Sequence, residues 1–421
     1  MTGPTAPAST LEALREALAF EPLGAPAGNV TLGKGTLDGR PVRVALVENR
    51  IASGSIGKAE VAKLVPLFTI AAREKSPVVL YLDSAGARVS EGLEALGAFR
   101  RLFREALAAR TAGAPIAVVL GRNCYGGASM LAHVAARRLF SPGTQLAMSG
   151  PSIIAQSAGA NALDEVFRAI AEATIGAAAR AKATDANTVW SAGMDLPAWL
   201  RSALSPDAGS FDAFHGRHAA LRERLEKGLT TRQPENIRRK ELEKLFDQGY
   251  KAVECDGVIT GTATRDGAEV PMLGLVGNSP VGAERAWRFA QSAWRLGIEA
   301  PARIEVLLDC ESHAARLEDE KAVLTEYIVD MGVALAALAA RGTHVELTVL
   351  NRAGGGVYVA LAAPAARVSV VFGADIQVLP GAAVASILGA HRDAVADISD
   401  YRRAGVADVE HKLGLPPTLK P

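Results

Sequence analysis

Short apolar runs alternate along the chain with segments whose apolar residues recur at helical spacing. Two of the runs end in aspartate: PVVLYLD leads to Asp83 and RIEVLLD leads to Asp309. Continuous apolar runs of this length are typical of buried strands, and a segment of helical spacing comes before and after each of them. The pattern therefore predicts an α/β protein in which the same outline occurs twice.

Both halves also begin with a hairpin signal. The β-rich residues Gly28–Val47 surround Asp38-Gly39, and the residues Gly257–Val276 surround Asp266-Gly267. Asp-Gly between two β-rich runs predicts a two-residue turn. Ahead of the first hairpin, Ser9 or Thr10 is expected to cap a short helix over LEALREALAF, and Met1–Ala8 is expected to be frayed.

A third similarity joins a strand, a glycine turn and a helix. VLGRNCYGGASMLAHVAARR (119–138) lies over VLNRAGGGVYVALAAPAARV (349–368) without a gap, because 352 − 122 and 356 − 126 both equal 230. In this alignment Arg122 and Gly126 meet identical residues at Arg352 and Gly356. The chain is therefore interpreted as two copies of one β/α unit.

The copies are separated by a change in composition. From Arg201 to Gly249 the β-branched runs disappear and charged residues with helical spacing replace them. A chain of 421 residues suits two domains. We expect an N-terminal tail and short helix over 1–27, a first domain over 28–205, a charged helical connector over 206–248 and a second domain over 249–421.

Charge and cysteine content narrow the class of protein. Lys and Arg number 46 against 45 Asp and Glu, so the near-neutral chain has no reason to bind nucleic acid. The three cysteines (Cys124, Cys255 and Cys310) show no zinc-ligand spacing, so we expect reduced thiols and no metal. No signal-peptide pattern and no apolar run of membrane length occurs, which predicts a soluble, cytoplasmic protein that does not contact the membrane.

Glycine turns between a strand and a helix suggest a particular chemistry. Such a turn can aim free backbone amides at one point, with the positive end of the helix dipole behind them. The first half has two, at Ser84-Ala85-Gly86-Ala87 and at Gly126-Gly127, and either could also be a simple packing glycine. The P-loop, dinucleotide, serine-elbow and HExxH motifs are absent, which favours an oxyanion hole over a phosphate cradle.

These motifs resemble the carboxyltransferase and decarboxylase branch of the crotonase superfamily. The resemblance is strongest to biotin-independent malonate decarboxylase with its β and γ subunits fused in that order. LYLDSAGARVSEG, NCYGGASMLA and MSGPSIIAQSAG match the β-type pattern, while the segments Asp309–His344 and 349–368 match the γ-type pattern. The resemblance implies two crotonase-like ββα-spiral domains in tandem, from about Gly28 to about Leu413.

The resemblance also implies a reaction and partners. A malonyl thioester on an acyl-carrier protein, or on CoA, would lose CO2 and leave the acetyl thioester. This chain would bind no cofactor or metal, and its thioester substrate would be carried on a CoA-like prosthetic group. The implied partners are an acyl-carrier protein subunit and an acyl-transferase subunit, in a homodimer or a larger hetero-oligomer.

Roles follow for the glycine turns. The backbone amides of Gly86, Ala87, Gly126 and Gly127 are expected to stabilise the thioester enolate. Gly355 and Gly356 in the second half are expected to face the departing carboxylate or CO2. Together these residues form the predicted catalytic set.

Side chains near the turns are candidates for binding the substrate. Arg88 could pair with the malonyl carboxylate or a carrier phosphate, or form a surface salt bridge. Tyr125 and Tyr358 could supply a proton or wall the pocket, although packing is favoured for both. Ser149, Gly150 and Gln156 enter through the MSGPSIIAQSAG motif.

Three further features have two interpretations each. His313 could protonate a carbanion or lie on a solvent-facing loop. Cys124 has no neighbouring histidine in the sequence, so packing is favoured over nucleophilic catalysis. Arg137-Arg138 and FRRLFR (99–104) could receive an acidic carrier protein or form a solvated helix face.

Two other functions stay open. The chain could be a biotin-dependent carboxyltransferase acting on acyl-CoA, because biotin is usually carried on another subunit. It could also be a non-catalytic scaffold subunit that binds an acyl carrier or CoA without turning it over.

Overall fold

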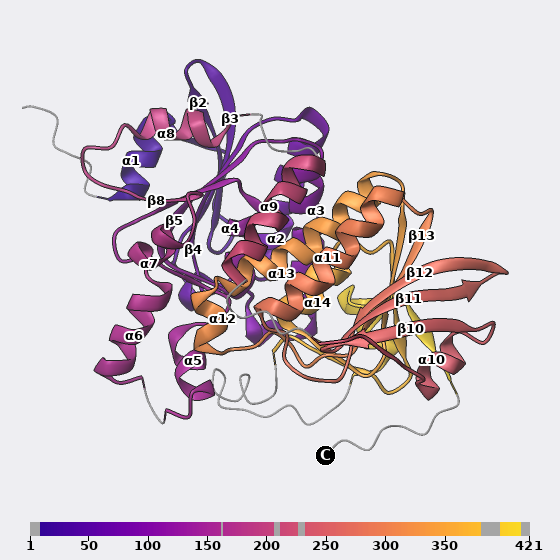
Figure 1. Cartoon of the computed structure of the whole chain (residues 1–421). Helices are drawn as coiled ribbons and strands as arrows, with labels where there is room; N and C mark the ends of the chain where they lie inside the picture. Colours follow the sequence, from indigo (N-terminus) through magenta and orange to yellow (C-terminus); the bar gives the residue numbers. More distant parts are fainter. Residues whose placement is uncertain (1–8, 161–162, 206–210, 226–231, 380–395, 414–421) are drawn as a thin grey trace, which may run out of the picture. The chain divides into compact units, whose positions relative to one another are not determined.

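A computed structural model describes residues 9–160, 163–205, 211–225, 232–379 and 396–413 (Figure 1). The chain divides into two compact units, each built from three segments. Unit 1 takes the described residues of Met1–Arg88, Glu105–Ala213 and Ala315–Thr325. Unit 2 takes those of Val89–Arg104, Phe214–Ala314 and Glu326–Pro421.

Unit 1 is built on an eight-stranded sheet of order β1-β2-β3-β4-β5-β6-β8, in which β7 pairs with β5. The strands β1 to β3 are antiparallel, and β3 to β8 pair in parallel. The strands are β1 (Glu21–Pro22), β2 (Val30–Leu37), β3 (Arg40–Val47), β4 (Val78–Ser84), β5 (Ile116–Tyr125), β6 (Arg137–Phe140), β7 (Gln145–Ala147) and β8 (Asn187–Val189).

The helices of unit 1 connect these strands. They are α1 (Thr10–Ala17), the 3-10 turn η1 (Ala52–Gly54), α2 (Lys58–Glu74), α4 (Gly126–Val134), α5 (Pro151–Ser157), α6 (Glu165–Ile175), α7 (Ala177–Ala183), α8 (Leu196–Ala203) and α12 (Leu317–Lys321). Helix α3 (Leu93–Thr111) contributes residues to both units. The predicted cap of the first helix is confirmed, because the Ser9 side chain accepts a hydrogen bond from the Glu12 amide.

Unit 2 repeats this plan with an eight-stranded sheet of order β18-β16-β14-β13-β12-β11-β10-β9 and a separate pair, β15 with β17. Its strands are β9 (Glu235–Asn236), β10 (Tyr250–Cys255), β11 (Val258–Arg265), β12 (Ala268–Leu275), β13 (Arg303–Leu308), β14 (His344–Val349), β15 (Arg352–Gly354), β16 (Arg367–Val371), β17 (Asp375–Gln377) and β18 (Val409–His411). Its helical elements are η2 (Val89–Glu91), α9 (Phe211–Leu225), α10 (Lys240–Leu245), α11 (Ala283–Glu299), α13 (Leu324–Ala340), α14 (Gly355–Ala362) and α16 (Ile398–Ala404), of which α9 and α13 begin with residues of unit 1.

Both predicted hairpins are confirmed. Asp38-Gly39 joins β2 to β3 and Asp266-Gly267 joins β11 to β12. All four turn residues have positive φ, between 51° and 78°. Positive φ at both positions of a two-residue loop matches the twist of the flanking strands, which is why Asp-Gly is favoured there.

Each sheet has a buried apolar core. Strands β3, β4, β5 and β6 place fully buried residues between the sheet and helices α1 and α8, among them Val44, Val79, Val119 and Leu139. In unit 2, Val306, Leu307 and Leu347 are likewise fully buried. The apolar runs that ended in Asp83 and Asp309 are therefore buried central strands, as the pattern predicted. The predicted α/β class with two repeated units is confirmed.

The register of the repeat differs by one residue from the gapless alignment. Gly126 begins α4 with a φ of 53°, and Gly355 begins α14 with a φ of 54°. The counterpart of Gly126 is therefore Gly355 rather than Gly356. The glycine that must adopt positive φ at the junction fixes the correspondence, and the second copy carries one extra residue before its next strand.

Two expected segments lie partly or wholly outside the described residues. Met1–Ala8 lies outside them, and the predicted connector is described over 211–225 and 232–248. Within the part of the chain that is described, no helix has both the length and the apolar content needed to cross a bilayer.

Candidate active site

The two glycine turns of unit 1 lie against each other. A Cβ atom built on Gly86, whose φ is 96°, would stand 2.6 Å from the carbonyl oxygen of Tyr125 and 3.2 Å from the amide nitrogen of Gly127. Only glycine permits this close approach together with positive φ. The turn after β4 and the start of α4 are 40 residues apart in sequence (126 − 86) and form one corner of unit 1.

The backbone amides of this corner fall into two groups. The Gly86 amide donates to the Ser84 hydroxyl at 3.1 Å, and the Gly126 amide donates to the Met148 carbonyl at 3.2 Å. Among the described residues, the amides of Ala87 and Gly127 have no hydrogen-bond acceptor, and both residues are only partly buried. Of the four predicted donors, these two are therefore able to bind a ligand oxygen.

Helix α4 strengthens the corner electrostatically. Gly127 is the second residue of that helix, where an amide has no partner within the helix and the helix dipole is positive. Gly86 and Gly126 shape the corner, because their own amides are already bonded. The assignment of catalytic roles to all six glycine-turn residues stays a prediction.

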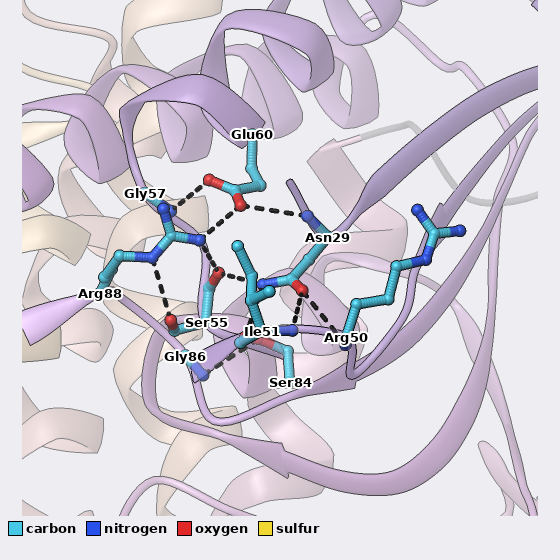
Figure 2. Close-up of polar contacts among 9 residues, drawn as sticks. All are labelled: Asn29, Arg50, Ile51, Ser55, Gly57, Glu60, Ser84, Gly86 and Arg88. Atoms are coloured by element: carbon cyan, nitrogen blue, oxygen red, sulfur yellow. Dashed lines mark hydrogen bonds and ion pairs between the residues drawn. The ribbon is translucent and has the colours of Figure 1, made fainter. Parts of the chain in front are cut away.

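Arg88 immediately follows the corner, and Figure 2 shows its guanidinium between Glu60 and Ser55. It forms an ion pair with the buried Glu60 carboxylate and donates to the Ser55 carbonyl oxygen at 2.8 Å and hydroxyl at 3.2 Å. The sequence analysis offered a surface salt bridge as the alternative role of Arg88. Arg88 does form an ion pair, but the Glu60 carboxylate in it is buried. Recognition of a substrate carboxylate by Arg88 stays a prediction.

The tyrosine at the end of β5 has its hydroxyl occupied. Tyr125 donates to the Gln145 side-chain oxygen at 2.7 Å. Burial, with smaller contributions from nearby acidic groups, raises its pKa well above the ordinary value, so it is protonated at neutral pH. Gly150 lies beside the Tyr125 ring. A Cβ atom built on Gly150 would stand 3.7 Å from the ring atom Cδ2 of Tyr125.

The remaining residues of the MSGPSIIAQSAG motif have different environments. Ser149 is buried, and its amide donates to a Glu320 carboxylate oxygen at 2.9 Å. Glu320 is itself paired with the buried Arg180 guanidinium at 2.9 Å. Gln156 is exposed on α5.

The corresponding corner of unit 2 is more tightly packed. Gly355 and Gly356 are buried, and a Cβ on Gly355 would stand 2.5 Å from the Ser312 hydroxyl oxygen. The backbone around it repeats unit 1: a bridge joins Val281 to His313 as another joins Ile56 to Ala87. The counterpart of Ala87 is thus His313.

His313 is partly buried rather than on a solvent-facing loop. Its Nδ1 atom lies 3.1 Å from the Ser312 hydroxyl oxygen. Burial lowers its pKa to about 4, so the imidazole is neutral near pH 7 and does not supply a proton as an imidazolium.

Several side chains singled out in the sequence are engaged inside the fold. Tyr358 is fully buried and donates to the Val406 carbonyl, in agreement with packing. Cys124 is fully buried, and its burial raises the pKa of the thiol well above the ordinary value, which disfavours a nucleophilic role.

Two of the arginines proposed to receive a carrier protein are buried, whereas Arg101, Arg104 and Arg137 are exposed. Arg138 is buried and donates to the Asn187 side chain at 2.7 Å, and Arg100 is buried and donates to the Ala362 carbonyl at 3.0 Å. Arg104 donates to the carbonyl oxygens of Ala363 and Ala365. Both predictions, a docking patch and a solvated helix face, are wrong for Arg100 and Arg138. Each of these arginines is buried and donates hydrogen bonds to acceptors within its own unit.

Glu60 is the residue near the corner that the sequence analysis missed. It stands three residues after Gly57, at the start of α2, which is the spacing of a helix-capping acid. That spacing could have indicated a helix start, but not the pairing with Arg88. Among the described residues, no group of three or more His, Cys, Asp or Glu could hold a metal ion.

Part of unit 1 is similar to a known protein family. Residues 8–179 match the family described as the carboxyl transferase domain. The matched segment contains both glycine turns of unit 1. It covers less than half of the chain and nothing of β10 to β18.

Two curated relatives illustrate the range of the similarity. The acetyl-coenzyme A carboxylase carboxyl transferase subunit beta of Synechococcus sp. (strain JA-3-3Ab) is 32% identical over 140 residues, which are 33% of this chain and 45% of that protein. The methylmalonyl-CoA decarboxylase subunit alpha of Veillonella parvula is 35% identical over 103 residues, 24% of this chain and 20% of that protein. The matches thus span less than half of either relative.

Among solved structures, a Pseudomonas malonate decarboxylase hetero-tetramer in complex with malonate is 21% identical, with a TM-score of 0.45. The match covers 54% of this chain and 92% of that one. A likeness at this level carries no inference about activity.

Proposed function

We propose that this chain decarboxylates a malonyl thioester, carried on an acyl-carrier protein or on CoA, to the acetyl thioester. The observation that carries the proposal is the pair of acceptor-free amides at Ala87 and Gly127, held at one corner by the approach of Gly86 to Gly127. Donors preorganised in this way stabilise an oxyanion better than a neutral carbonyl.

The chemistry needs such a site and little else. When the bond between the α-carbon and the carboxylate breaks, CO2 leaves and the bonding electron pair moves into the thioester carbonyl, which becomes an enolate oxygen. Two hydrogen bonds from Ala87 and Gly127 to that oxygen would each lower the barrier by about 3 kcal/mol. A proton from another source then adds to the α-carbon.

The side chains of the corner are consistent with this reaction. Cys124 is buried with a raised pKa, and the proposal requires no nucleophile. His313 belongs to the corner of unit 2 and its imidazole is neutral, so the proton is assigned to water or to another group. The thioester is recognised at its carbonyl, and its CoA-like arm is part of the substrate rather than a cofactor of this chain.

The family match supports the class of reaction. It includes the residues of both turns, and its description concerns transfer of carboxyl groups. The names of the two relatives include a carboxyl transferase and a decarboxylase. The carrier protein, the acyl-transferase and the oligomer remain part of the proposal.

A biotin-dependent carboxyltransferase is the second candidate, favoured by the name of the Synechococcus relative. It would use the same enolate, but the carboxyl group would be exchanged with carboxybiotin instead of being released. The corner of unit 1 is suited to both reactions, because both pass through a thioester enolate.

The experiment is to incubate the purified chain with malonyl-CoA and with a malonyl carrier protein, and to follow CO2 and acetyl thioester without biotin. Release of both supports the decarboxylase. Exchange that depends on carboxybiotin supports the transferase, and binding without either reaction supports a scaffold.

A pair of variants tests the corner in the same assay. Gly127→Val is expected to abolish turnover while the fold is retained. Gly193→Val is the matched control, because a Cβ on Gly193 would meet nothing within 4 Å. Full activity in a folded Gly127→Val variant would contradict the role of the Gly127 amide.

A further inference from the structure

A buried carboxylate lies beside the catalytic corner of unit 1. Figure 2 shows the Glu60 carboxylate surrounded by three hydrogen-bond donors. The Asn29 amide donates to one oxygen at 3.1 Å, and the Gly57 amide donates to the other at 3.0 Å. Arg88 completes the set with an ion pair, and the Glu60 side chain has an exposed fraction of 0%.

The Glu60 carboxylate occupies space that a side chain at position 28 would need. A Cβ on Gly28, whose φ is 54°, would stand 2.0 Å from the Glu60 oxygen Oε1. A buried carboxylate is tolerated only when it is paired and hydrogen-bonded. The glycine at position 28 and the three donors therefore serve the same end, which is to keep an ionised Glu60 beside Arg88.

Arg88 connects the Glu60 carboxylate to the glycine corner. Its side chain donates to Ser55, and its backbone amide donates to the Ile56 carbonyl at 2.9 Å. The Ile56 amide donates to the Gly86 carbonyl at 2.7 Å. The Ala87 peptide group thus lies between two backbone hydrogen bonds to Ile56, and these bonds set the direction of the Ala87 N–H.

Unit 2 provides an internal comparison. The same two backbone bonds occur there, from Val281 to Ser312 at 2.8 Å and from Ala314 to Val281 at 2.9 Å. The charged part is replaced: Arg285 occupies the helix position of Glu60, and a Cβ on Gly257 would stand 2.1 Å from its guanidinium.

Among the described residues, no ion pair at this second corner corresponds to the pair of Glu60 and Arg88 in unit 1. Arg285 donates to the carbonyl oxygens of Gly257 and Ser279, and Ala314 stands where unit 1 has Arg88. The second corner is also the one whose glycines are buried. The ion pair is therefore specific to the corner whose glycine-turn amides are partly exposed and free to bind a ligand.

We propose that Glu60 is a positioning residue that acts through Arg88 to hold the Ala87 amide toward the thioester oxygen. The positioning itself is a property of unit 1, and only its effect on turnover rests on the proposed function. Glu60 contacts no substrate in this proposal, and Arg88 links Glu60 to the corner.

Amide hydrogen exchange tests the positioning without any assay of activity. In Glu60→Gln, the amides of Ile56 and Arg88 are expected to exchange at least about tenfold faster, because their bonds open locally more often. Helix α4 is expected to exchange at the rate of the unchanged protein. Unchanged rates at Ile56 and Arg88, or equal acceleration throughout unit 1, would overturn the proposal.

Two more variants keep the test decisive if Glu60→Gln folds poorly. Arg88→Met removes the partner and is expected to accelerate the same amides, while the double variant adds no further acceleration because the two residues act as one anchor. The matched control is Glu305→Gln, a fully buried carboxylate paired with Arg303 at 2.8 Å in unit 2. It is expected to leave Ile56 and Arg88 unchanged, and additive effects of Glu60 and Arg88 would contradict the anchor.

Kinetics then connects the anchor to catalysis. With malonyl thioester, Glu60→Gln is expected to lower kcat about tenfold or more and to change KM less than about twofold, since the Ala87 amide acts mainly on the transition state. Unaltered kcat in a variant with accelerated exchange would remove the catalytic part of the proposal. If the protein without any substitution shows no turnover, the proposed function is contradicted, but the hydrogen-exchange result remains valid.

Discussion

The backbone amide of Asn123 donates a hydrogen bond to the side chain of Asp83 across 3.1 Å. This hydrogen bond joins the end of strand β4 to the end of strand β5, just before the glycine corner. Unit 2 contains the same bond, from the Arg352 amide to Asp309 at 3.3 Å. The aspartates that close the two apolar runs therefore have one structural role, which is to hold neighbouring strand ends together where the glycine turns begin.

Replacing Asp83 tests this role. Asp83→Ala leaves the partly buried Asn123 amide without its acceptor and is expected to lower the free energy of unfolding by about 1–3 kcal/mol. Asp83→Asn retains a side-chain oxygen and is expected to lose less. Urea unfolding of the two variants measures the difference, and equal losses would show that the hydrogen bond does not matter.

The close approach of Gly86 to Gly127 gives a second prediction. Gly86→Ala combines positive φ with a Cβ only 2.6 Å from the Tyr125 carbonyl, whereas Gly113→Ala has a similar φ of 89° and nothing within 4 Å. Backbone strain is expected to cost each variant about 1–2 kcal/mol of unfolding free energy. Overpacking adds about 1–3 kcal/mol for Gly86→Ala alone. Equal unfolding free energies for the two variants would contradict the corner geometry.

The Glu60 ion pair makes stability depend on pH in a defined direction. Burial by itself raises the pKa of Glu60, but hydrogen bonds from Arg88, Asn29 and Gly57 outweigh it and lower the pKa below its ordinary 4.5. The folded state therefore binds a proton less readily than the unfolded state. The stabilisation is full above pH 4.5 and is lost as the pH falls through the lower folded pKa.

Unfolding of Glu60→Gln across this range checks the direction. At pH 7 the variant is expected to be less stable than the unchanged protein by about 1.5–3 kcal/mol. The difference in unfolding free energy is expected to shrink as the pH falls below 4.5. A difference that grows toward acid pH would mean that Glu60 is protonated in the fold.

His313 gives a prediction about protonation in unit 2. Because burial lowers its pKa to about 4 from 6.5, protonation favours the unfolded state, and stability should fall as the pH drops from 6.5 to 4. His313→Gln is expected to remove that part of the slope. Nuclear magnetic resonance titration of the imidazole checks the midpoint directly, and a midpoint near 6.5 would place the ring in water.

The sequence predicts local features of this fold well, because they depend on neighbouring residues. The Asp-Gly turns and the buried strands before Asp83 and Asp309 follow from backbone sterics and apolar runs. Glycine turns were also found, since only glycine can adopt positive φ there without strain. The one-residue error in the repeat arose because identical residues outnumbered the single glycine that fixes the register.

Features that depend on distant contacts were not predictable. Glu60 and Arg88 are 28 residues apart and come from different elements. The burial of Arg138 and of Tyr358 depends on contacts from Asn187 and Val406, which no local pattern reveals. The choice of Ala87 and Gly127 among the predicted donors needed the hydrogen bonds of the folded chain.

The most direct test of the account is a crystal structure of the chain with a malonyl thioester analogue that cannot lose CO2. The thioester carbonyl oxygen is expected at about 2.7–3.1 Å from both the Ala87 and the Gly127 amide nitrogens. A carbonyl oxygen out of reach of both amides, or amides that donate to the protein's own carbonyls, would contradict it.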